Sequence, residues 1–119
     1  MIDDLDYVSV PVEDLSDAVR FYRDVLGLRL QYEIPRRWAE FSVGSTRLAL
    51  YPKEEDEGRG GDVAFRVNDL DKEVSRLEAC KVVFSHGIEA FEVPDRKGRL
   101  ARFRDPSGNR LELVEYVRG

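Results

Sequence analysis

This sequence has very few cysteine and histidine residues, and this scarcity excludes several kinds of site. It has one cysteine and one histidine among 119 residues, so neither an internal disulfide nor a site of several histidines can form within one chain. A single cysteine is typical of a reducing compartment, and we expect a cytoplasmic protein. No apolar run approaches the about 18 residues of a membrane span. The first ten residues also lack the basic start and apolar stretch of a signal peptide.

The net charge and the length of the chain limit its binding partners and its number of domains. The net charge of −5 disfavours nucleic acid and anionic membranes as partners. The 119 residues suffice for one domain with its own hydrophobic core, and we expect a single domain.

The sequence contains an internal repeat. Residues 8–15 (VSVPVEDL) align with residues 63–70 (VAFRVNDL), and residues 45–50 (STRLAL) align with residues 108–113 (GNRLEL). The first pair is typical of a strand that leads into a helix, and the second of a turn that leads into a strand. The repeat therefore predicts two modules, at about residues 1–53 and 62–117, with the Gly-rich stretch 54–61 as their linker.

Each module is predicted to run β-α-β-β-β. Asp14 and Asp69 are expected to cap the two helices, because an aspartate can accept hydrogen bonds from free N–H groups of the first turn. Gly27 is expected to end the first helix. The remaining strands are predicted at 30–34, 38–43, 82–88 and 100–104, with 90–93 as a linking segment and 95–99 as a charged turn.

Alternation along the strands predicts which side chains share a face. Leu48, Leu50, Leu111 and Leu113 are assigned to the core beneath the helices. The opposite face then mixes large apolar side chains with a few charged ones: Tyr7, Trp38, Tyr51, Val114, Asp62, Arg66, Arg102 and Glu112. This mixture suits a ligand cavity, although an ordinary solvent-exposed sheet face remains the alternative.

Two motifs in this order resemble the vicinal oxygen chelate superfamily. They are VEDLSDAVRFYRDVLGL at residues 12–28 and FRDPSGNRLELVE at residues 103–115. The superfamily includes glyoxalase I, bleomycin resistance proteins, extradiol dioxygenases and methylmalonyl-CoA epimerase. The resemblance implies an α+β fold in which two βαβββ modules form a U-shaped, half-open barrel with helices on its outer face. It also implies a homodimer.

The resemblance implies four positions for metal ligands: Tyr7, Ala49, Asp62 and Glu112. Only Glu112 has the family's usual ligand type, and Ala49 has no donor atom. Zn, Ni and Fe favour imidazole ligands, so we expect no cofactor and no transition metal. A weakly held divalent metal stays open, because oxygen ligands alone can bind Ca or Mg.

Two further residues have reactive side chains. His86 lies in Ser-His-Gly, which indicates a loop, and we interpret it as a loop histidine in preference to a general base. Cys80 follows the second helix and is predicted to be a buried small side chain, not a nucleophile.

The leading functional hypothesis is a metal-free protein of the bleomycin-resistance kind. It would sequester a small aromatic or cationic molecule in a dimer cavity, with ligand contacts from Tyr7, Trp38, Tyr51, Asp62, Arg66, Arg102 and Glu112. Three alternatives stay open. They are a metal-dependent enzyme of glyoxalase or dioxygenase type, a metal-free lyase or isomerase that uses Asp62 or Glu112 as general base, and an interaction module. The sequence specifies neither the ligand nor whether the modules pair within one chain or between two.

Overall fold

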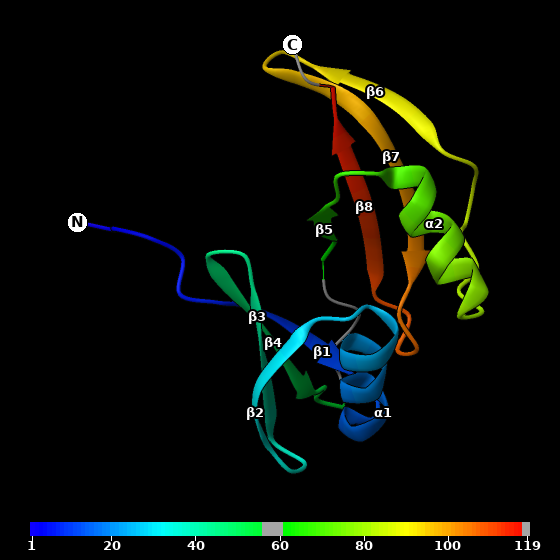
Figure 1. Cartoon of the computed structure of the whole chain (residues 1–119). Coiled ribbons are helices and arrows are strands. Elements are labelled where there is room, and N and C mark those ends of the chain that lie inside the picture. The colour runs from blue at the N-terminus through cyan, green and yellow to red at the C-terminus, as the bar shows by residue number, and fades with distance from the viewer. Residues whose placement is uncertain (56–60, 118–119) are drawn as a thin grey trace. The chain divides into compact units, whose positions relative to one another are not determined.

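The structure is a computed structural model that describes residues 1–55 and 61–117 (Figure 1). Residues 56–60 of the predicted linker lie outside the described residues. The chain divides into two compact units. Unit 1 contains residues Met1–Gly61 with Pro106–Asn109, and unit 2 contains Asp62–Asp105 with Arg110–Gly119.

Unit 1 is a four-stranded mixed sheet with one helix. Its elements, in chain order, are β1 (Val8–Val12), α1 (Leu15–Arg20), η1 (Phe21–Val25), β2 (Arg29–Ile34), β3 (Trp38–Val43) and β4 (Thr46–Pro52). The strand order is β1-β4-β3-β2. β1 pairs with β4 in parallel, and the other neighbours are antiparallel.

Unit 2 repeats this arrangement. Its elements are β5 (Val63–Arg66), α2 (Leu70–Ala79), β6 (Glu89–Val93), β7 (Arg96–Arg104) and β8 (Arg110–Tyr116), and its strand order is β5-β8-β7-β6. Again the first strand pairs with the last in parallel. The predicted α+β class and the two βαβββ modules are therefore confirmed, while closure of the two sheets into a half-open barrel stays a prediction.

Both helices begin at the predicted caps. The side chain of Asp14 accepts a hydrogen bond from the Asp17 N–H at 3.0 Å, and that of Asp69 accepts one from the Lys72 N–H at 3.2 Å. After α1 the helix widens into the π-helical turn η1, where the Leu26 N–H bonds the Phe21 carbonyl five residues back. Gly27 then adopts a φ of 80°, which ends the helix as the sequence predicts.

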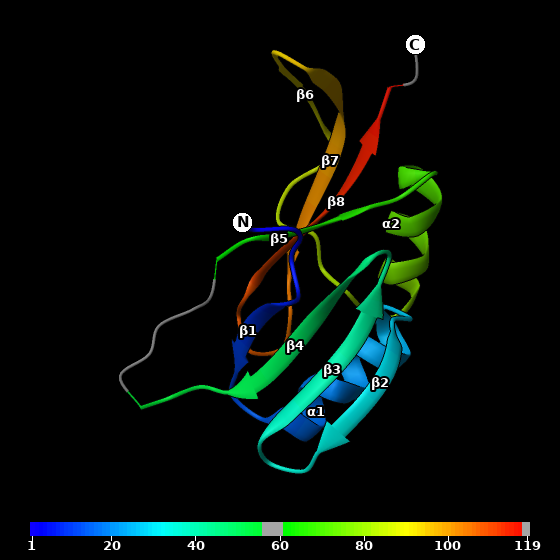
Figure 2. The ribbon, with the colours of Figure 1, turned by 90° about the vertical axis from the view of Figure 1, so that its left-hand side faces the viewer.

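The core of each unit lies between its helix and one face of its sheet. Figure 2 shows α1 behind the sheet of unit 1. Buried apolar side chains of unit 1 include Val10, Val12, Leu15, Val19, Tyr22, Phe41, Leu48 and Leu50, and those of unit 2 include Leu70, Leu77, Ala101, Phe103, Leu111 and Leu113. The predicted face assignment is confirmed for Leu48, Leu50, Leu111 and Leu113. Alternation along β1 predicts that Val8 shares the core face with Val10 and Val12, but Val8 is 43% exposed at the start of the strand.

The segment after α2 corrects two predictions. Residues 82–88 form no strand; Phe84 makes only an isolated bridge to Phe103, and the strand lies at 89–93 instead. The reason is that the N–H groups of Cys80 and Val82 both bond the Leu77 carbonyl and close the helix. Val82 is therefore not available to pair at the edge of the sheet. Cys80, predicted to be buried, is exposed because it stands at the helix end.

The charged segment 95–99 is also different from its prediction. The hairpin between β6 and β7 turns at Pro94 and Asp95, since Val93 pairs directly with Arg96. Residues 96–99 extend β7 and do not form a loop.

The Asp-Pro-Ser-Gly-Asn motif has a structural role. Its Pro106–Asn109 part belongs to unit 1. There the Ser107 hydroxyl accepts a hydrogen bond from the Glu13 N–H at 2.8 Å, and the buried Asn109 amide donates one to the Pro11 carbonyl at 2.7 Å. Gly108 has a φ of 90°, which favours glycine. The motif therefore satisfies the backbone on either side of the end of β1.

Gly98 permits the close pairing of β7 with β8. A Cβ placed on Gly98 would lie 2.0 Å from the Glu115 carbonyl oxygen, which belongs to the backbone and cannot rotate away. We therefore expect Gly98→Ala to lower the free energy of unfolding by about 1–3 kcal/mol, measured by urea denaturation. Gly87→Ala is the matched control, because no atom would lie within 4 Å of its Cβ. Equal stability of the two variants would contradict this reading of the strand pair.

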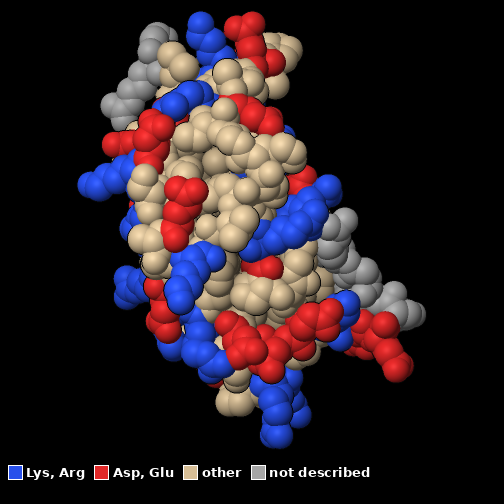
Figure 3. Space-filling model, turned by 90° about the vertical axis from the view of Figure 1, so that its right-hand side faces the viewer, with Lys and Arg blue, Asp and Glu red and all other residues tan. Residues whose placement is uncertain are grey.

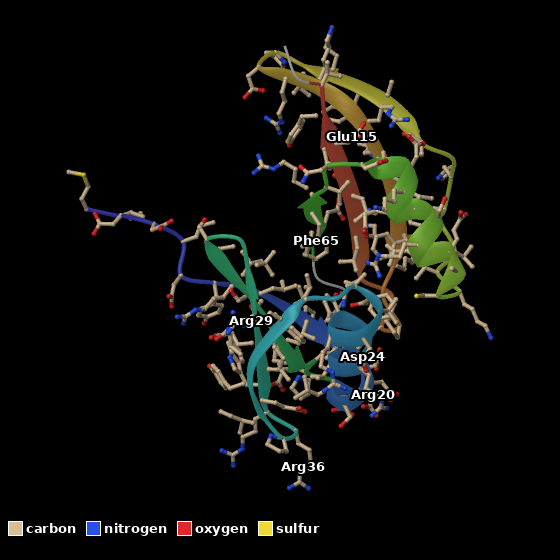
Figure 4. All side chains as sticks on the ribbon, viewed as in Figure 1. Arg20, Asp24, Arg29, Arg36, Phe65 and Glu115 are labelled. Atoms are coloured by element: carbon tan, nitrogen blue, oxygen red, sulfur yellow. The ribbon has the colours of Figure 1, made fainter. Side chains whose placement is uncertain are left out.

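Glu115 of β8 caps the start of α2 from outside the helix (Figure 4). Its Oε2 accepts a hydrogen bond from the Leu70 N–H at 2.7 Å, and its Oε1 lies 3.0 Å from Arg99. Arg99 also bonds Asp71 at 2.8 Å. The hydrogen bond from Leu70, followed by that from Arg99, holds the pKa of Glu115 below its ordinary value of 4.5.

A carboxyl whose pKa is lower in the folded state stabilises the fold above its unfolded pKa, and this contribution is lost as the pH falls through the folded pKa. Stability of the native protein should therefore drop when the pH is lowered below 4.5. In Glu115→Gln that drop should be smaller, because the amide does not titrate. Urea denaturation at pH 3 to 7 measures both curves, and parallel curves for the two proteins would contradict the role of Glu115.

Candidate ligand-binding site

Three aromatic rings lie together on the face of the unit 1 sheet that is turned away from α1. Tyr7 precedes β1, Trp38 is the first residue of β3, and Tyr51 lies on β4. The Tyr7 and Trp38 rings meet edge to face, with centroids 5.3 Å apart. The Trp38 and Tyr51 rings are stacked, with an angle of 22° between planes and 6.4 Å between centroids. We call these three residues the aromatic wall.

Strand register explains why two of the rings, those of Trp38 and Tyr51, meet. β4 lies between β1 and β3, so residues of all three strands stand side by side on one face. Pro11 of β1 pairs with Tyr51, and Glu40 of β3 pairs with Ala49. Trp38 stands two residues before Glu40, and Tyr51 two residues after Ala49. Because β3 and β4 are antiparallel, Trp38 and Tyr51 therefore lie opposite each other on the same face. Tyr7 is 44% exposed, so part of the wall is open to a ligand.

Glu40 is a site residue that the sequence analysis missed. It shares the face of Trp38, and its side chain is only 6% exposed. The Trp38 Nε1–H donates to Glu40 Oε1 at 3.2 Å, and the Arg47 guanidinium lies 3.5 Å from Oε2. The signal was present in the stretch WAEFSV, where a glutamate stands between core residues Ala39 and Phe41. Its burial, however, depends on neighbours from other strands.

Unit 2 contains a pocket of about 190 Å³ on the corresponding side of its sheet. Its lining includes three residues predicted from sequence, Asp62, Arg102 and Glu112, together with Ser85, His86, Phe103, Arg104, Arg110 and Leu111. His86, interpreted above as a loop histidine, is exposed and lies in this lining. The sequence analysis did not predict that the segment after α2 would reach this face.

The carboxylates of this pocket are paired with arginines. Glu112 and Arg102 stand opposite each other on β8 and β7, and Arg102 Nε lies 3.3 Å from Glu112 Oε2. Arg102 also contacts Glu89 at 3.2 Å. Asp62 accepts from Arg110 at 2.7 Å. The pocket therefore holds charges of both signs at close range.

Arg66, predicted from the sequence as a ligand contact, lies apart from these charged groups. Arg66 of β5 lines a separate depression with Val67, Asn68, Glu115 and Tyr116, away from the pocket of Asp62 and Glu112. Arg36 stands at the tip of the β2–β3 hairpin, and Figure 4 shows it pointing away from the strands.

The four positions at which the resemblance implies metal ligands do not make a suitable donor set. Tyr7 and Ala49 belong to unit 1, and Asp62 and Glu112 belong to unit 2. Ala49 offers only a methyl group, and both carboxylates are engaged by arginines. Over residues 1–55 and 61–117, no group of three or more His, Cys, Asp or Glu side chains is arranged to hold a metal. Transition metals that favour imidazole do not fit these residues.

Surface charge is mixed where the helices lie. Figure 3 shows basic and acidic side chains interspersed on that side, without a continuous basic surface of the kind that binds nucleic acid. Among residues 1–55 and 61–117, no helix is both long enough and apolar enough to cross a bilayer.

Comparisons with known proteins agree with the resemblance. The chain is 30% identical to the uncharacterized protein YraH of Bacillus subtilis, over 89% of this chain and 93% of YraH. It is 28% identical to the metallothiol transferase FosB of Staphylococcus haemolyticus, over 95% of this chain and 84% of FosB. The crystal structure of TnmS3, an antibiotic binding protein from Streptomyces sp. CB03234, superposes with a TM-score of 0.81 at 28% identity, covering 98% of each chain.

A family model places these similarities in one group. The model of the glyoxalase/bleomycin resistance protein/dioxygenase superfamily matches residues 4–113, which is nearly the whole chain. Together with the two βαβββ modules, this match shows that the chain belongs to the glyoxalase/bleomycin resistance protein/dioxygenase superfamily.

Proposed function

We propose that this protein binds and sequesters a small aromatic or cationic molecule, without a transition metal and without chemical change to it. The observation that carries the proposal is the aromatic wall of Tyr7, Trp38 and Tyr51, which stands beside the carboxylate of Glu40. Flat aromatic ligands stack on such rings, and cations are attracted to both the ring faces and the carboxylate. The likeness to TnmS3, an antibiotic binding protein, supports the same class of function.

The proposed binder acts as a homodimer in the cytoplasm. A second copy would cover the open sheet face and complete a cavity around the ligand, as the family resemblance implies. The exposed thiol of Cys80, the one cysteine of the chain, suits a reducing compartment. Tyr7, Trp38 and Tyr51 would contact the ligand's ring, and Glu40 beside them would contact its charged or polar part.

A second candidate is a lyase or isomerase that uses the pocket of unit 2. The observation in its favour is that Asp62, Glu112 and His86 share one pocket with Arg102 and Arg110. A carboxylate or imidazole could remove a proton, and an arginine could stabilise the resulting enolate. Similarity to FosB, a metallothiol transferase, keeps the metal-dependent form of this candidate open as well.

Trp38 is the single tryptophan of the chain, so its fluorescence reports directly on the aromatic wall. We expect 9-aminoacridine, a flat cation, to quench Trp38 emission saturably and to raise the melting temperature. Tyr51→Ala should weaken binding by about 1–3 kcal/mol, the range found when one stacking ring is removed. Tyr116→Ala, in unit 2, is the matched control and should bind normally. Binding that is unaffected by Tyr51→Ala would refute the wall as the ligand site.

The metal-free part of the proposal has its own test. We expect the purified protein to contain far less than one Zn, Ni, Fe or Mn ion per chain, because Ala49 and the arginine-bound carboxylates supply too few ligands. Elemental analysis measures this content, and melting curves with each added metal show whether it stabilises the fold. A full equivalent of metal, with stabilisation that a chelator reverses, would instead favour the metal-dependent enzyme.

A further inference from the structure

We propose that the Glu40 carboxylate is the counter-ion for a positive charge on the ligand's aromatic ring system, so that the wall selects aromatic cations over neutral rings of the same shape. This inference rests on the proposed function and identifies the chemical class of its ligand.

Burial makes the Glu40 carboxylate costly unless it is compensated. An ionised carboxylate has about four hydrogen-bond acceptor positions, and removing it from water costs free energy that partners must offset. Among the described residues, Glu40 has two such partners. The indole of Trp38 is neutral, and the Arg47 contact, at 3.5 Å, is at the limit of hydrogen bonding. The buried charge is therefore incompletely compensated within unit 1.

The two modules show what is missing at Glu40. Phe41 pairs with Leu48 in unit 1 as Phe103 pairs with Leu111 in unit 2. Counting one residue along each strand, Glu40 opposite Ala49 corresponds to Arg102 opposite Glu112. In unit 2 the opposed side chains form an ion pair at 3.3 Å. In unit 1 the residue opposite the charge is an alanine, so the cross-strand counter-ion is absent at this position.

The surroundings of Glu40 suit a cation joined to a flat ring. The next residues across the sheet from Glu40 are Ala49 and then Ser9, both small. Trp38 stands two residues from Glu40 on the same strand, and its indole Nε1 lies 3.2 Å from Glu40 Oε1. A ligand of two fused rings that stacks on Trp38 could therefore place a positively charged ring atom next to the Glu40 carboxylate. The faces of the wall attract the same charge.

Arg47 is the internal partner that such a cation would replace. Its side chain is 56% exposed and can turn into solvent when a ligand arrives. Two variants should therefore act in opposite directions. Glu40→Gln keeps the size of the side chain and its hydrogen bond to Trp38 but removes the charge. Arg47→Gln removes the competing cation and leaves the carboxylate for the ligand.

The test compares two probes of one shape by titration calorimetry. They are the 1-methylquinolinium cation and neutral 1-methylnaphthalene. We expect the native protein to bind the cation about tenfold or more tightly than the neutral ring, because the cation adds a Coulomb attraction to Glu40 and a cation–π attraction to the wall. Glu40→Gln should abolish the preference and leave the affinity for 1-methylnaphthalene unchanged. Arg47→Gln should increase the affinity for the cation alone.

Glu33→Gln is the matched control. Glu33 is an exposed carboxylate on β2 that stands opposite Ala39, the residue before Glu40 on β3. It should keep the preference for the cation. Melting curves of each variant verify that it is folded. Equal binding of the two probes, or a preference that survives in Glu40→Gln, would overturn this inference while leaving the proposed aromatic site intact. Binding of neither probe would overturn both the inference and the proposed function.

Discussion

Parallel pairing of the first and last strand in each module is the constraint on which the rest of the structure depends. A parallel pair needs a crossover connection, and here the helix after the first strand provides it. The helix must then cover one face of the sheet, which places alternate residues of β3, β4, β7 and β8 in the core, among them Phe41, Leu48, Phe103 and Leu111. The remaining residues are left on the opposite face. The aromatic wall and the pocket of Asp62 and Glu112 both follow from this division.

Local chemistry made much of the fold predictable. Asp14 and Asp69 mark the helix starts because an aspartate placed there satisfies N–H groups of its own first turn. Trp38–Val43 forms a strand at the predicted residues, since its apolar alternation agrees with its place inside the sheet. Repetition of the same signals in both halves fixed the α+β class and the order of elements.

Features that depend on distant partners were not predictable in the same way. The strand expected at 82–88 does not form, because the Val82 N–H bonds the Leu77 carbonyl and closes α2. The apolar run alone did not indicate this hydrogen bond at the helix end. Glu40 was missed as a site residue, because its burial arises from neighbours that belong to other strands. Likewise His86 reaches the pocket of unit 2 only because the segment after α2 runs alongside β7, where the Ser85 N–H bonds the Arg102 carbonyl.

The two modules share a backbone plan but differ in the chemistry of their open faces. Unit 2 pairs its charges internally, as Arg102 with Glu112 and Arg110 with Asp62. At the corresponding positions unit 1 has Tyr7 for Asp62, Ala49 for Glu112 and Glu40 for Arg102. The buried Glu40 is therefore opposite an alanine, and its one cationic contact among the described residues is Arg47 at 3.5 Å. The two modules therefore share one fold, but the open faces of their sheets differ in chemistry. We propose that ligand recognition depends mainly on the unit 1 face, where the charge of Glu40 is incompletely compensated.

The most direct test of this account is an NMR titration of ¹⁵N-labelled protein with 1-methylquinolinium. Because the chain has one tryptophan, the indole N–H of Trp38 gives a single side-chain signal, and this N–H donates to Glu40. The account predicts that this signal and the backbone signals of β3 and β4 shift first and saturate together. Shifts confined to His86, Arg102 and their neighbours in unit 2 would contradict it and move the ligand site to the charged pocket.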